Sequence, residues 1–210
     1  MLKLLNIKKS FGGSKVLRDV TLSVSQGEVI GLSGGNGAGK STLLNIATGF
    51  LSADGGKLSF NDTELNSLEP WQFSRLGIKR SFQTARFNLH LTLKDQLYLG
   101  KTSLRKNQNV ILDSGIGKFL TSFPSETPPA ILRKVEVVRA LISEPKIIFL
   151  DEPSAGLSKT EIEEFATFIG KHRPTTVTLV IVEHRMDLMR KINAKVISLR
   201  NGSISEKDQD

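Results

Sequence analysis

A glycine-rich segment at residues 34–41 limits what this chain can fold into more than any other feature. It reads Gly-Gly-Asn-Gly-Ala-Gly-Lys-Ser and fits the phosphate-loop pattern G-x-x-x-x-G-K-[ST] at every position. A short apolar strand pattern, Val29 to Leu32, precedes the segment, and a helical pattern, Ser41 to Gly49, follows it. In that setting the loop N–H groups and the positive end of the helix can surround phosphate oxygens. The segment therefore predicts a nucleoside triphosphate site on a strand–loop–helix unit.

The residue types in this loop indicate its chemistry. Lys40 brings a point charge to the β- and γ-phosphates, Ser41 offers a hydroxyl to a magnesium ion, and Thr42 adds a further donor. The alternative is a glycine-rich turn without a ligand, and the complete pattern between a strand and a helix argues against it. We predict that the nucleotide contacts Gly35, Asn36, Gly37, Ala38, Gly39, Lys40, Ser41 and Thr42.

Two carboxylates end a second apolar strand pattern, Ile147 to Leu150. In phosphate-loop proteins an aspartate such as Asp151 holds the magnesium ion, directly or through water. The neighbouring Glu152 can orient or deprotonate an attacking water. Two acids at this place are more often only the solvated end of a strand, but a phosphate loop in the same chain favours the functional interpretation. Asp151 is therefore a predicted metal ligand and Glu152 a predicted catalytic residue.

The remaining pattern predicts an α/β protein. Residues 1–30 alternate apolar and polar side chains as extended structure does, and short apolar strand patterns recur at Val177–Val182 and Lys195–Leu199. A helical pattern, Lys159–Lys171, separates two of the buried strands, and helical patterns dominate from Pro70 to Ser143. Short apolar strands that alternate with helices are typical of a parallel sheet flanked by helices.

The composition narrows the class of protein without identifying a partner. The 210 residues include no cysteine, which excludes disulfides and thiolate metal sites, and the first ten lack the apolar stretch of a signal peptide. The apolar runs are far shorter than the roughly 20 residues that cross a bilayer, so we expect any membrane role to be peripheral. The formal charge is +8, and a basic stretch between Phe73 and Val110 is either a solvated face or a docking surface.

Several motifs around the loop carry a family resemblance. The stretch from Asp151 to Leu157 resembles the Walker B motif and D-loop of ABC (ATP-binding cassette) ATPases. Val182-Glu183-His184 resembles their H-loop, and Arg80-Ser81-Phe82-Gln83 resembles their Q-loop. The resemblance runs from about Lys3 to Ser205, and it is closest to the cassettes of branched-chain amino acid and urea importers.

The resemblance implies roles for residues outside the loop and the acidic pair. His184 would contact the γ-phosphate, and Gln83 would sense the magnesium ion and the attacking water, so both are predicted catalytic residues. Phe11 stands where the family places an aromatic that stacks on adenine, and Val16 joins it as a nucleotide contact. Each of these residues has an ordinary structural explanation when taken alone, but their order around a complete phosphate loop favours the functional one. The predicted magnesium ligands are then Ser41, Gln83 and Asp151.

The family also implies a fold, cofactors and partners. The expected fold is a single ABC ATPase domain, an α/β phosphate-loop NTPase with a mostly parallel core sheet, an antiparallel β subdomain and a small helical subdomain. Residues 1–82 and 145–210 would form the core with its β subdomain, and about 83–144 the helical subdomain. With ATP and Mg²⁺ as cofactors, the chain would hydrolyse ATP to power a membrane transporter. Its partners would be transmembrane permease subunits and a second ABC ATPase subunit, with which it would form a homodimer or heterodimer. It would lie at the cytoplasmic face of the inner (plasma) membrane and would not bind nucleic acid.

One family motif is degenerate in this chain. ABC ATPases carry a signature, L-S-G-G-Q, which contributes a serine hydroxyl and backbone N–H groups to the γ-phosphate held by the opposite subunit. When the helix is aligned on Arg133 to Glu136, the five signature positions are Thr127, Pro128, Pro129, Ala130 and Ile131. The serine is absent, and the two prolines have no N–H to donate. The helical pattern persists, with Thr127 as the predicted N-cap and Pro128 as the first helical residue. The D-loop ends in Ser158, where the family usually has an aspartate that bridges the two subunits.

These departures leave three functional hypotheses. In the first, the chain works opposite a different ATPase subunit with an intact signature, or forms a homodimer with two slow sites. In the second, it binds ATP as a structural or regulatory subunit with little hydrolysis, although the retained Glu152 argues against complete loss. In the third, it is an ABC ATPase that acts on nucleic acid. The net charge favours the third hypothesis, whereas the absence of a coiled-coil insertion and the transporter-like surroundings of Gln83 disfavour it.

Overall fold

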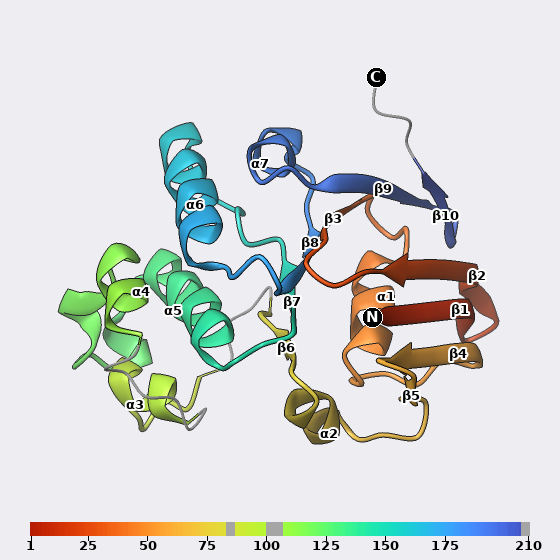
Figure 1. Ribbon diagram of the computed structural model, residues 1–210, viewed down its shortest axis with the longest axis horizontal. Coiled ribbons are helices and arrows are strands. Elements are labelled where there is room, and N and C mark those ends of the chain that lie inside the picture. The colour runs from red at the N-terminus through yellow and green to blue at the C-terminus, as the bar shows by residue number, and fades with distance from the viewer. Residues whose placement is uncertain (83–86, 100–106, 207–210) are drawn as a thin grey trace.

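The computed structural model describes residues 1–82, 87–99 and 107–206, and its strands form two sheets (Figure 1). The first is an antiparallel sheet in the order β2–β1–β4–β5, built from β1 (Leu2–Phe11), β2 (Ser14–Val24), β4 (Gly55–Phe60) and β5 (Thr63–Glu64). The second has the order β10–β9–β3–β8–β7–β6, built from β3 (Val29–Ser33), β6 (Ile78–Arg80), β7 (Ile147–Asp151), β8 (Thr178–Val182), β9 (Lys195–Arg200) and β10 (Ser203–Glu206). It is parallel apart from β10, which pairs antiparallel with β9.

Helices lie between and beside the two sheets (Figure 1). The α-helices of the described residues are α1 (Lys40–Ala47), α2 (Pro70–Arg75), α3 (Leu93–Tyr98), α4 (Gln108–Asp113), α5 (Pro129–Ile142), α6 (Lys159–His172) and α7 (Met186–Lys191). Two short 3₁₀ turns, Gly117–Phe119 and Pro124–Glu126, lie between α4 and α5. None of these helices combines the length and the apolar character that a membrane crossing requires.

The parallel sheet is buried on both faces, because alternate residues of its strands point in opposite directions. Phe149 and Val180 face one side, where they share a core with α1 and the antiparallel sheet. Leu150 and Ile181 face the other side, where they share a core with α5 and α6. Both central strands, β7 and β8, are buried along their whole length, which explains their uninterrupted apolar sequence. The predicted α/β class with a mostly parallel sheet and an additional antiparallel sheet is confirmed.

A third apolar cluster joins the helices on the side away from the antiparallel sheet. Leu93 and Leu97 of α3, Ile111 of α4, and Val135 and Val138 of α5 belong to it. In Figure 1 these helices stand apart from the strands, at the left of the view. The predicted division into a core and a helical subdomain at residues 83 and 144 stays a prediction.

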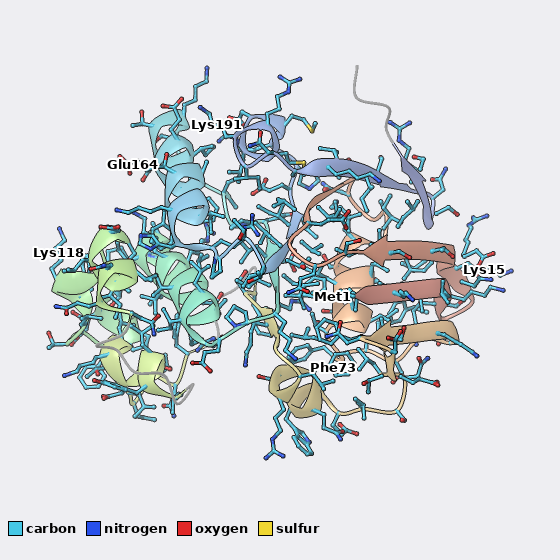
Figure 2. All side chains as sticks on the ribbon, viewed as in Figure 1. Met1, Lys15, Phe73, Lys118, Glu164 and Lys191 are labelled. Carbon is cyan, nitrogen blue, oxygen red and sulfur yellow. The ribbon has the colours of Figure 1, made fainter. Side chains whose placement is uncertain are left out.

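Charged side chains surround this core. Figure 2 shows Lys15, Lys118 and Lys191 at the periphery of the molecule, and all three are exposed. Phe73 of α2, in contrast, is buried. Part of the basic stretch noted between Phe73 and Val110 lies outside the described residues.

Four elements differ from the sequence-based expectation. Helical patterns were expected from Pro70 to Ser143, yet Ile78–Arg80 forms strand β6. This strand pairs parallel with β7 and forms the edge of the sheet. A strand of three residues is too short to show a period. Strand β5, helix α7 and the terminal strand β10 were also not predicted from the sequence.

The predicted start of α5 is wrong by one residue. The helix begins at Pro129, and Pro128 rather than Thr127 occupies the N-cap position. The Thr127 hydroxyl instead donates to the carbonyl of Phe123, 2.8 Å away, and so closes the preceding 3₁₀ turn. Threonine hydroxyls can serve either role, and the local turn uses this one before the helix begins.

Candidate functional site

The predicted site lies along one edge of the parallel sheet. Strands β3, β8 and β7 are neighbours, and their pairing aligns Leu32 with Val182 and Val182 with Asp151. Because the strands run in the same direction, the phosphate loop, the acidic pair and the His184 segment all leave the sheet at its carboxyl edge. Strands in a sheet are about 4.8 Å apart, which puts the end of β7 about 10 Å from the start of the phosphate loop. Ligands of open α/β sheets bind at this edge.

The phosphate loop is tightly supported from behind. Gly39 has a φ of 100° and forms the N-cap of α1, a left-handed conformation that favours glycine. A Cβ added to Gly39 would lie only 2.8 Å from Leu17 and 3.3 Å from a methyl carbon of Val16. The same test at Gly34 places a Cβ 2.4 Å from the carbonyl oxygen of Leu199. The loop can therefore pass close to β2 and β9 only with glycine at these two positions.

Residues on the outer side of the loop are accessible to a ligand. Gly35, Asn36, Gly37 and Ser41 are exposed or at the surface, whereas Lys40 is buried. The Lys40 ammonium donates to the carbonyl oxygens of Gly34 at 2.9 Å and Gly35 at 3.0 Å. The Lys40 side chain therefore folds over the phosphate loop, next to the region where phosphates would bind.

The acidic pair separates into two different environments. Asp151 is buried at the end of β7, where its Oδ2 forms an ion pair with the Arg80 guanidinium at 2.9 Å. Glu152 has a φ of 47°, which is uncommon for a residue with a Cβ, and its N–H donates to the carbonyl of Val182 at 3.0 Å. In this conformation, Glu152 Oε1 lies 3.2 Å from His184 Nε2. Two predicted catalytic residues, from the ends of β7 and β8, are thus brought together.

A buried carboxylate organises the loops after β7 and β8. Glu183 Oε1 accepts a hydrogen bond from the N–H of Ser154 at 2.9 Å. Its Oε2 accepts from the N–H groups of His184 at 3.1 Å and Arg185 at 3.3 Å. Glu183 belongs to the segment that resembles the H-loop, but no role was predicted for it. A charged residue directly after a fully apolar strand was the only signal that could have identified it.

Arg80 is a second residue whose role was not predicted. Besides Asp151, it contacts Asn45 Oδ1 at 2.6 Å on α1 and Thr48 Oγ1 at 3.2 Å directly after this helix. A basic residue in a three-residue edge strand carries no pattern that would place it against an acid 71 positions later in the chain.

The predicted adenine contacts occupy different surroundings. Phe11 is 48% exposed at the end of β1, with the Lys9 ammonium 5.6 Å from its ring centroid. Val16 is half-buried on β2, directly behind Gly39 of the phosphate loop. Gln83, predicted as both a catalytic residue and a metal ligand, lies outside the described residues.

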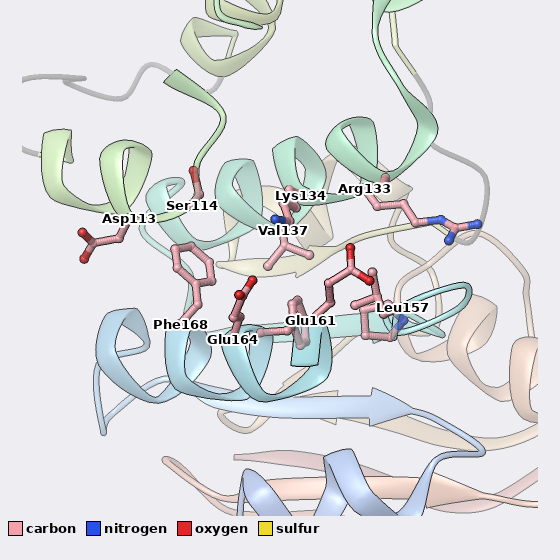
Figure 3. A pocket seen from close by; sticks show the side chains of 12 residues that line it. Asp113, Ser114, Arg133, Lys134, Val137, Leu157, Glu161, Glu164 and Phe168 are labelled. Carbon is pink, nitrogen blue, oxygen red and sulfur yellow. The ribbon is translucent and has the colours of Figure 1, made fainter. Parts of the chain in front are cut away.

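The degenerate signature leads directly into α5, and α5 is attached to the D-loop. The Arg133 guanidinium donates a hydrogen bond to the carbonyl of Ala155. Beside this contact lies a cavity of about 70 Å³ between α5 and α6 (Figure 3). Val137, Leu157 and Phe168 form apolar parts of its wall. None of the residues predicted to bind the nucleotide lines this cavity, so it is separate from the phosphate loop.

The donor set fits a magnesium-bound nucleoside triphosphate. Loop N–H groups, the N-terminus of α1 and Lys40 are the groups that bind phosphates in such loops. The hydroxyl of Ser41 and the carboxylate of Asp151 are hard oxygen donors of the kind that Mg²⁺ prefers. In the described residues, no cluster of three or more histidine or acidic side chains offers a competing metal site.

Comparison with known proteins agrees with this arrangement. The family model described as ABC transporter matches residues 17–155. A probable branched-chain amino acid transport ATP-binding protein, LivG, from Methanocaldococcus jannaschii is 29% identical over 95% of this chain and 86% of its own length. The ribose import ATP-binding protein RbsA of Lactococcus lactis subsp. cremoris is 32% identical over 95% of this chain, which spans 43% of RbsA.

A solved structure has the same fold. The crystal structure of a nucleotide-free ATP-binding cassette from an ABC transporter superimposes with a TM-score of 0.85 at 28% identity, covering 97% of this chain and 89% of the other. The family match extends over more than half of the chain and includes both the phosphate loop and the acidic pair. The chain thus belongs to the ABC transporter family, as one of its ATP-binding subunits, which are ATPases.

Proposed function

We propose that ATP is hydrolysed at the carboxyl edge of the parallel sheet, with Glu152 as general base, and that the chain thereby drives transmembrane permease subunits from the cytoplasmic face of the inner membrane. The observation that carries this proposal is the contact between Glu152 and His184, 3.2 Å long, beside the phosphate loop. A catalytic base needs a partner that holds it in the reactive orientation. His184, which follows the adjacent strand β8, is that partner for Glu152.

The proposed reaction is in-line attack of water on the γ-phosphorus. A bond forms from the water oxygen to this phosphorus, and the bond to the β–γ bridging oxygen breaks. Glu152 accepts the water proton, and His184 orients Glu152 and contacts the γ-phosphate. Lys40 and the N–H groups of residues 35–42 hold the phosphates, while Phe11 and Val16 contact the adenine. Mg²⁺, held by Ser41, Asp151 and Gln83, would supply the charge that neutralises the phosphate oxygens.

Cargo recognition is assigned to other subunits. The relatives are named for an amino acid system and for a sugar system, at similar identity to this chain. Proteins that handle such different cargo share the ATP chemistry, so the cassette carries the motor function alone. This supports a role as an interchangeable ATPase subunit and favours permease partners over nucleic acid.

The degenerate signature supports an unequal pair of ATPase subunits. Proline nitrogens at positions 128 and 129 carry no hydrogen, and α5 begins at Pro129, so this segment has lost donors that the L-S-G-G-Q motif supplies. Losing one such contact in the transition state costs about 2–4 kcal/mol. We propose that a partner with an intact signature completes the site on this chain's phosphate loop, whereas this chain completes the partner's site poorly.

The first test is ATP turnover by the purified chain and by Glu152→Gln, with ATP binding measured separately by calorimetry. We expect both proteins to bind ATP, the wild-type chain to turn over slowly, and Glu152→Gln to lose at least about 100-fold of the remaining rate. Glu163→Gln, an exposed acid paired with Lys191, is the matched control and should keep the wild-type rate. Turnover that survives in Glu152→Gln would contradict the general-base assignment, and fast turnover by the chain alone would contradict the unequal pair.

A further inference from the structure

Arg80 is a buried cation beside the predicted magnesium aspartate. It ends strand β6 at the edge of the parallel sheet, where it pairs in register with Phe149 of β7. Its side chain is 7% exposed and that of Asp151 is 6% exposed. Removing two charges from water is costly, and an ion pair repays that cost only with good geometry and further hydrogen bonds.

The guanidinium of Arg80 bridges three side chains of the site. One terminal nitrogen contacts Asp151 Oδ2 at 2.9 Å, and the other contacts Asn45 Oδ1 at 2.6 Å and Thr48 Oγ1 at 3.2 Å. Asn45 and Thr48 lie on and directly after α1, the helix that follows the phosphate loop. A planar, five-donor guanidinium can hold several acceptors in fixed directions, which a lysine ammonium does less well.

Two phenylalanines shield this contact. The guanidinium carbon lies 4.9 Å from the ring centroid of Phe82 and 5.9 Å from that of Phe50. The rings pack edge to face, with centroids 5.2 Å apart. Aromatic faces attract a guanidinium and limit the access of water, so they restrict the directions in which Arg80 can point.

The pairing constrains one oxygen of Asp151 only. Arg80 holds Oδ2, and the Asp151 N–H lies 3.4 Å from the Ser81 hydroxyl, so the carboxylate is tied to β6 and its backbone to the residue that follows β6. Within residues 1–82, 87–99 and 107–206, no hydrogen bond to Oδ1 is present. Hydrogen bonds from surrounding residues to metal-ligating carboxylates commonly fix the ligand's orientation.

We propose that Arg80 is a positioning residue for the divalent cation that accompanies ATP: it fixes the Asp151 carboxylate through Oδ2, relative to α1, and leaves Oδ1 for the cation. This inference rests on the proposed function, because it takes Asp151 as a magnesium ligand. Arg80 itself touches neither the nucleotide nor the cation. It acts on the cation through Asp151.

The test compares ATP affinity with Mg²⁺ and with EDTA, for the wild-type chain, Arg80→Met and Arg80→Lys. Methionine has a similar length without charge or donors, and lysine keeps the charge without the planar fork. In Arg80→Met we expect the gain in ATP affinity on adding Mg²⁺ to fall by about tenfold or more, with metal-free affinity close to wild type. The gain in ATP affinity on adding Mg²⁺ to Arg80→Lys should lie between the gains for the wild-type chain and for Arg80→Met. The comparison needs no turnover.

The matched control is Arg173→Met. Arg173 is a partly buried arginine at the C-terminal end of α6, where it hydrogen-bonds backbone carbonyls that include that of Val177, at the opposite end of the sheet from Asp151. This variant should keep the wild-type response to Mg²⁺, and thermal unfolding of every variant shows whether the fold persists. If Arg80→Met does not fold, the test uses Arg80→Lys, and the quantity compared is again the ratio of the ATP affinity with Mg²⁺ to that with EDTA.

Three results would overturn the inference. Equal losses with Mg²⁺ and with EDTA, or no loss at all, would make Arg80 a structural residue only. Tighter binding of Mg²⁺-ATP in Arg80→Met would mean that Arg80 competes with the cation for Asp151. If Mg²⁺ does not change the ATP affinity of the wild-type chain, the magnesium assignment is wrong, and this inference is wrong with it. The assignment of the ATP site would not be affected by that result.

Discussion

At the scale of single residues, the site depends on side chains that hold backbone rather than substrate. Glu183 is 2% exposed and accepts three backbone N–H groups, from Ser154, His184 and Arg185. Through these bonds one carboxylate connects the D-loop after Glu152 to the segment that carries His184. The contact between Glu152 and His184 therefore depends on a residue that takes no part in the chemistry.

Replacing this carboxylate by an amide tests that dependence. In Glu183→Gln one oxygen becomes an NH₂ group that faces backbone N–H, so at least one donor is left buried without an acceptor. We expect the free energy of unfolding to fall by about 1–3 kcal/mol, as measured by urea denaturation. ATP turnover should fall as well, since His184 loses its support. Glu163→Gln, at an exposed position, serves again as the control. An unchanged unfolding free energy in Glu183→Gln would contradict the assigned role.

At the scale of elements, an ion pair joins α4 to the end of α6. Asp113 Oδ2 lies 2.6 Å from the Lys171 ammonium and 2.8 Å from His172 Nε2. The His172 ring also packs against Phe168, with ring centroids 4.9 Å apart. Hydrogen bonds from Lys171 and then from His172 lower the pKa of the Asp113 carboxyl. Asp113 also lines the cavity (Figure 3), and its contact with α6 connects the helical cluster to the core that packs on the sheet.

The lowered pKa of Asp113 sets the pH range in which the contact stabilises the fold. Since the folded-state pKa lies below the unfolded one, near about 4, the stabilisation is fully present above that pH. It is lost as the pH falls through the lowered folded-state value. We expect Asp113→Asn to unfold at a lower temperature than wild type at pH 7, with a difference that shrinks below about pH 4 and in high salt. A difference that stays constant down to pH 3 would contradict this role.

At the scale of the whole molecule, if two ATPase subunits share each active site as proposed, this chain retains one half of that site better than the other. The half that would act on its own ATP contains Lys40, Asp151, Glu152 and His184. The half that would act on a partner's ATP, residues 127–131, has lost its serine and two donors. The tie from Arg133 to Ala155 still supports the start of α5, so the scaffold persists where the contact is lost.

A mixing experiment tests this asymmetry directly. One variant carries the five changes that restore the signature together with a defective phosphate loop: Thr127→Leu, Pro128→Ser, Pro129→Gly, Ala130→Gly, Ile131→Gln and Lys40→Ala. It should not turn over ATP alone, and the wild-type chain alone should be slow. Their mixture pairs an intact phosphate loop with an intact signature, so we expect turnover on the order of 30-fold above the wild-type chain.

The control for the mixture is the Lys40→Ala chain with its natural residues 127–131, which should add nothing to the wild-type rate. If the restored signature leaves the mixture as slow as this control, the missing signature contact does not limit turnover. The proposal of an unequal pair would then lose its basis.

Much of the site was predictable because its signals are local. The phosphate loop, the acids after β7 and the apolar strand Thr178–Val182 are short patterns in which neighbouring residues determine backbone shape and chemistry together. They predicted the α/β class and the residues along one sheet edge. Thr127 shows the limit of local patterns, since a hydroxyl that can cap a helix or close a turn is not assigned by its neighbours alone.

The sequence by itself determined the phosphate loop, the acidic pair and the alternation of strands and helices, because each is encoded within a few consecutive residues. Only the tertiary structure decided that Ile78–Arg80 is a strand, that Arg80 pairs with Asp151, and that Glu183 connects two loops. These contacts join residues that are dozens of positions apart. They exist because parallel strand pairing brings separate segments to one edge of the sheet, and buried charges there must find partners.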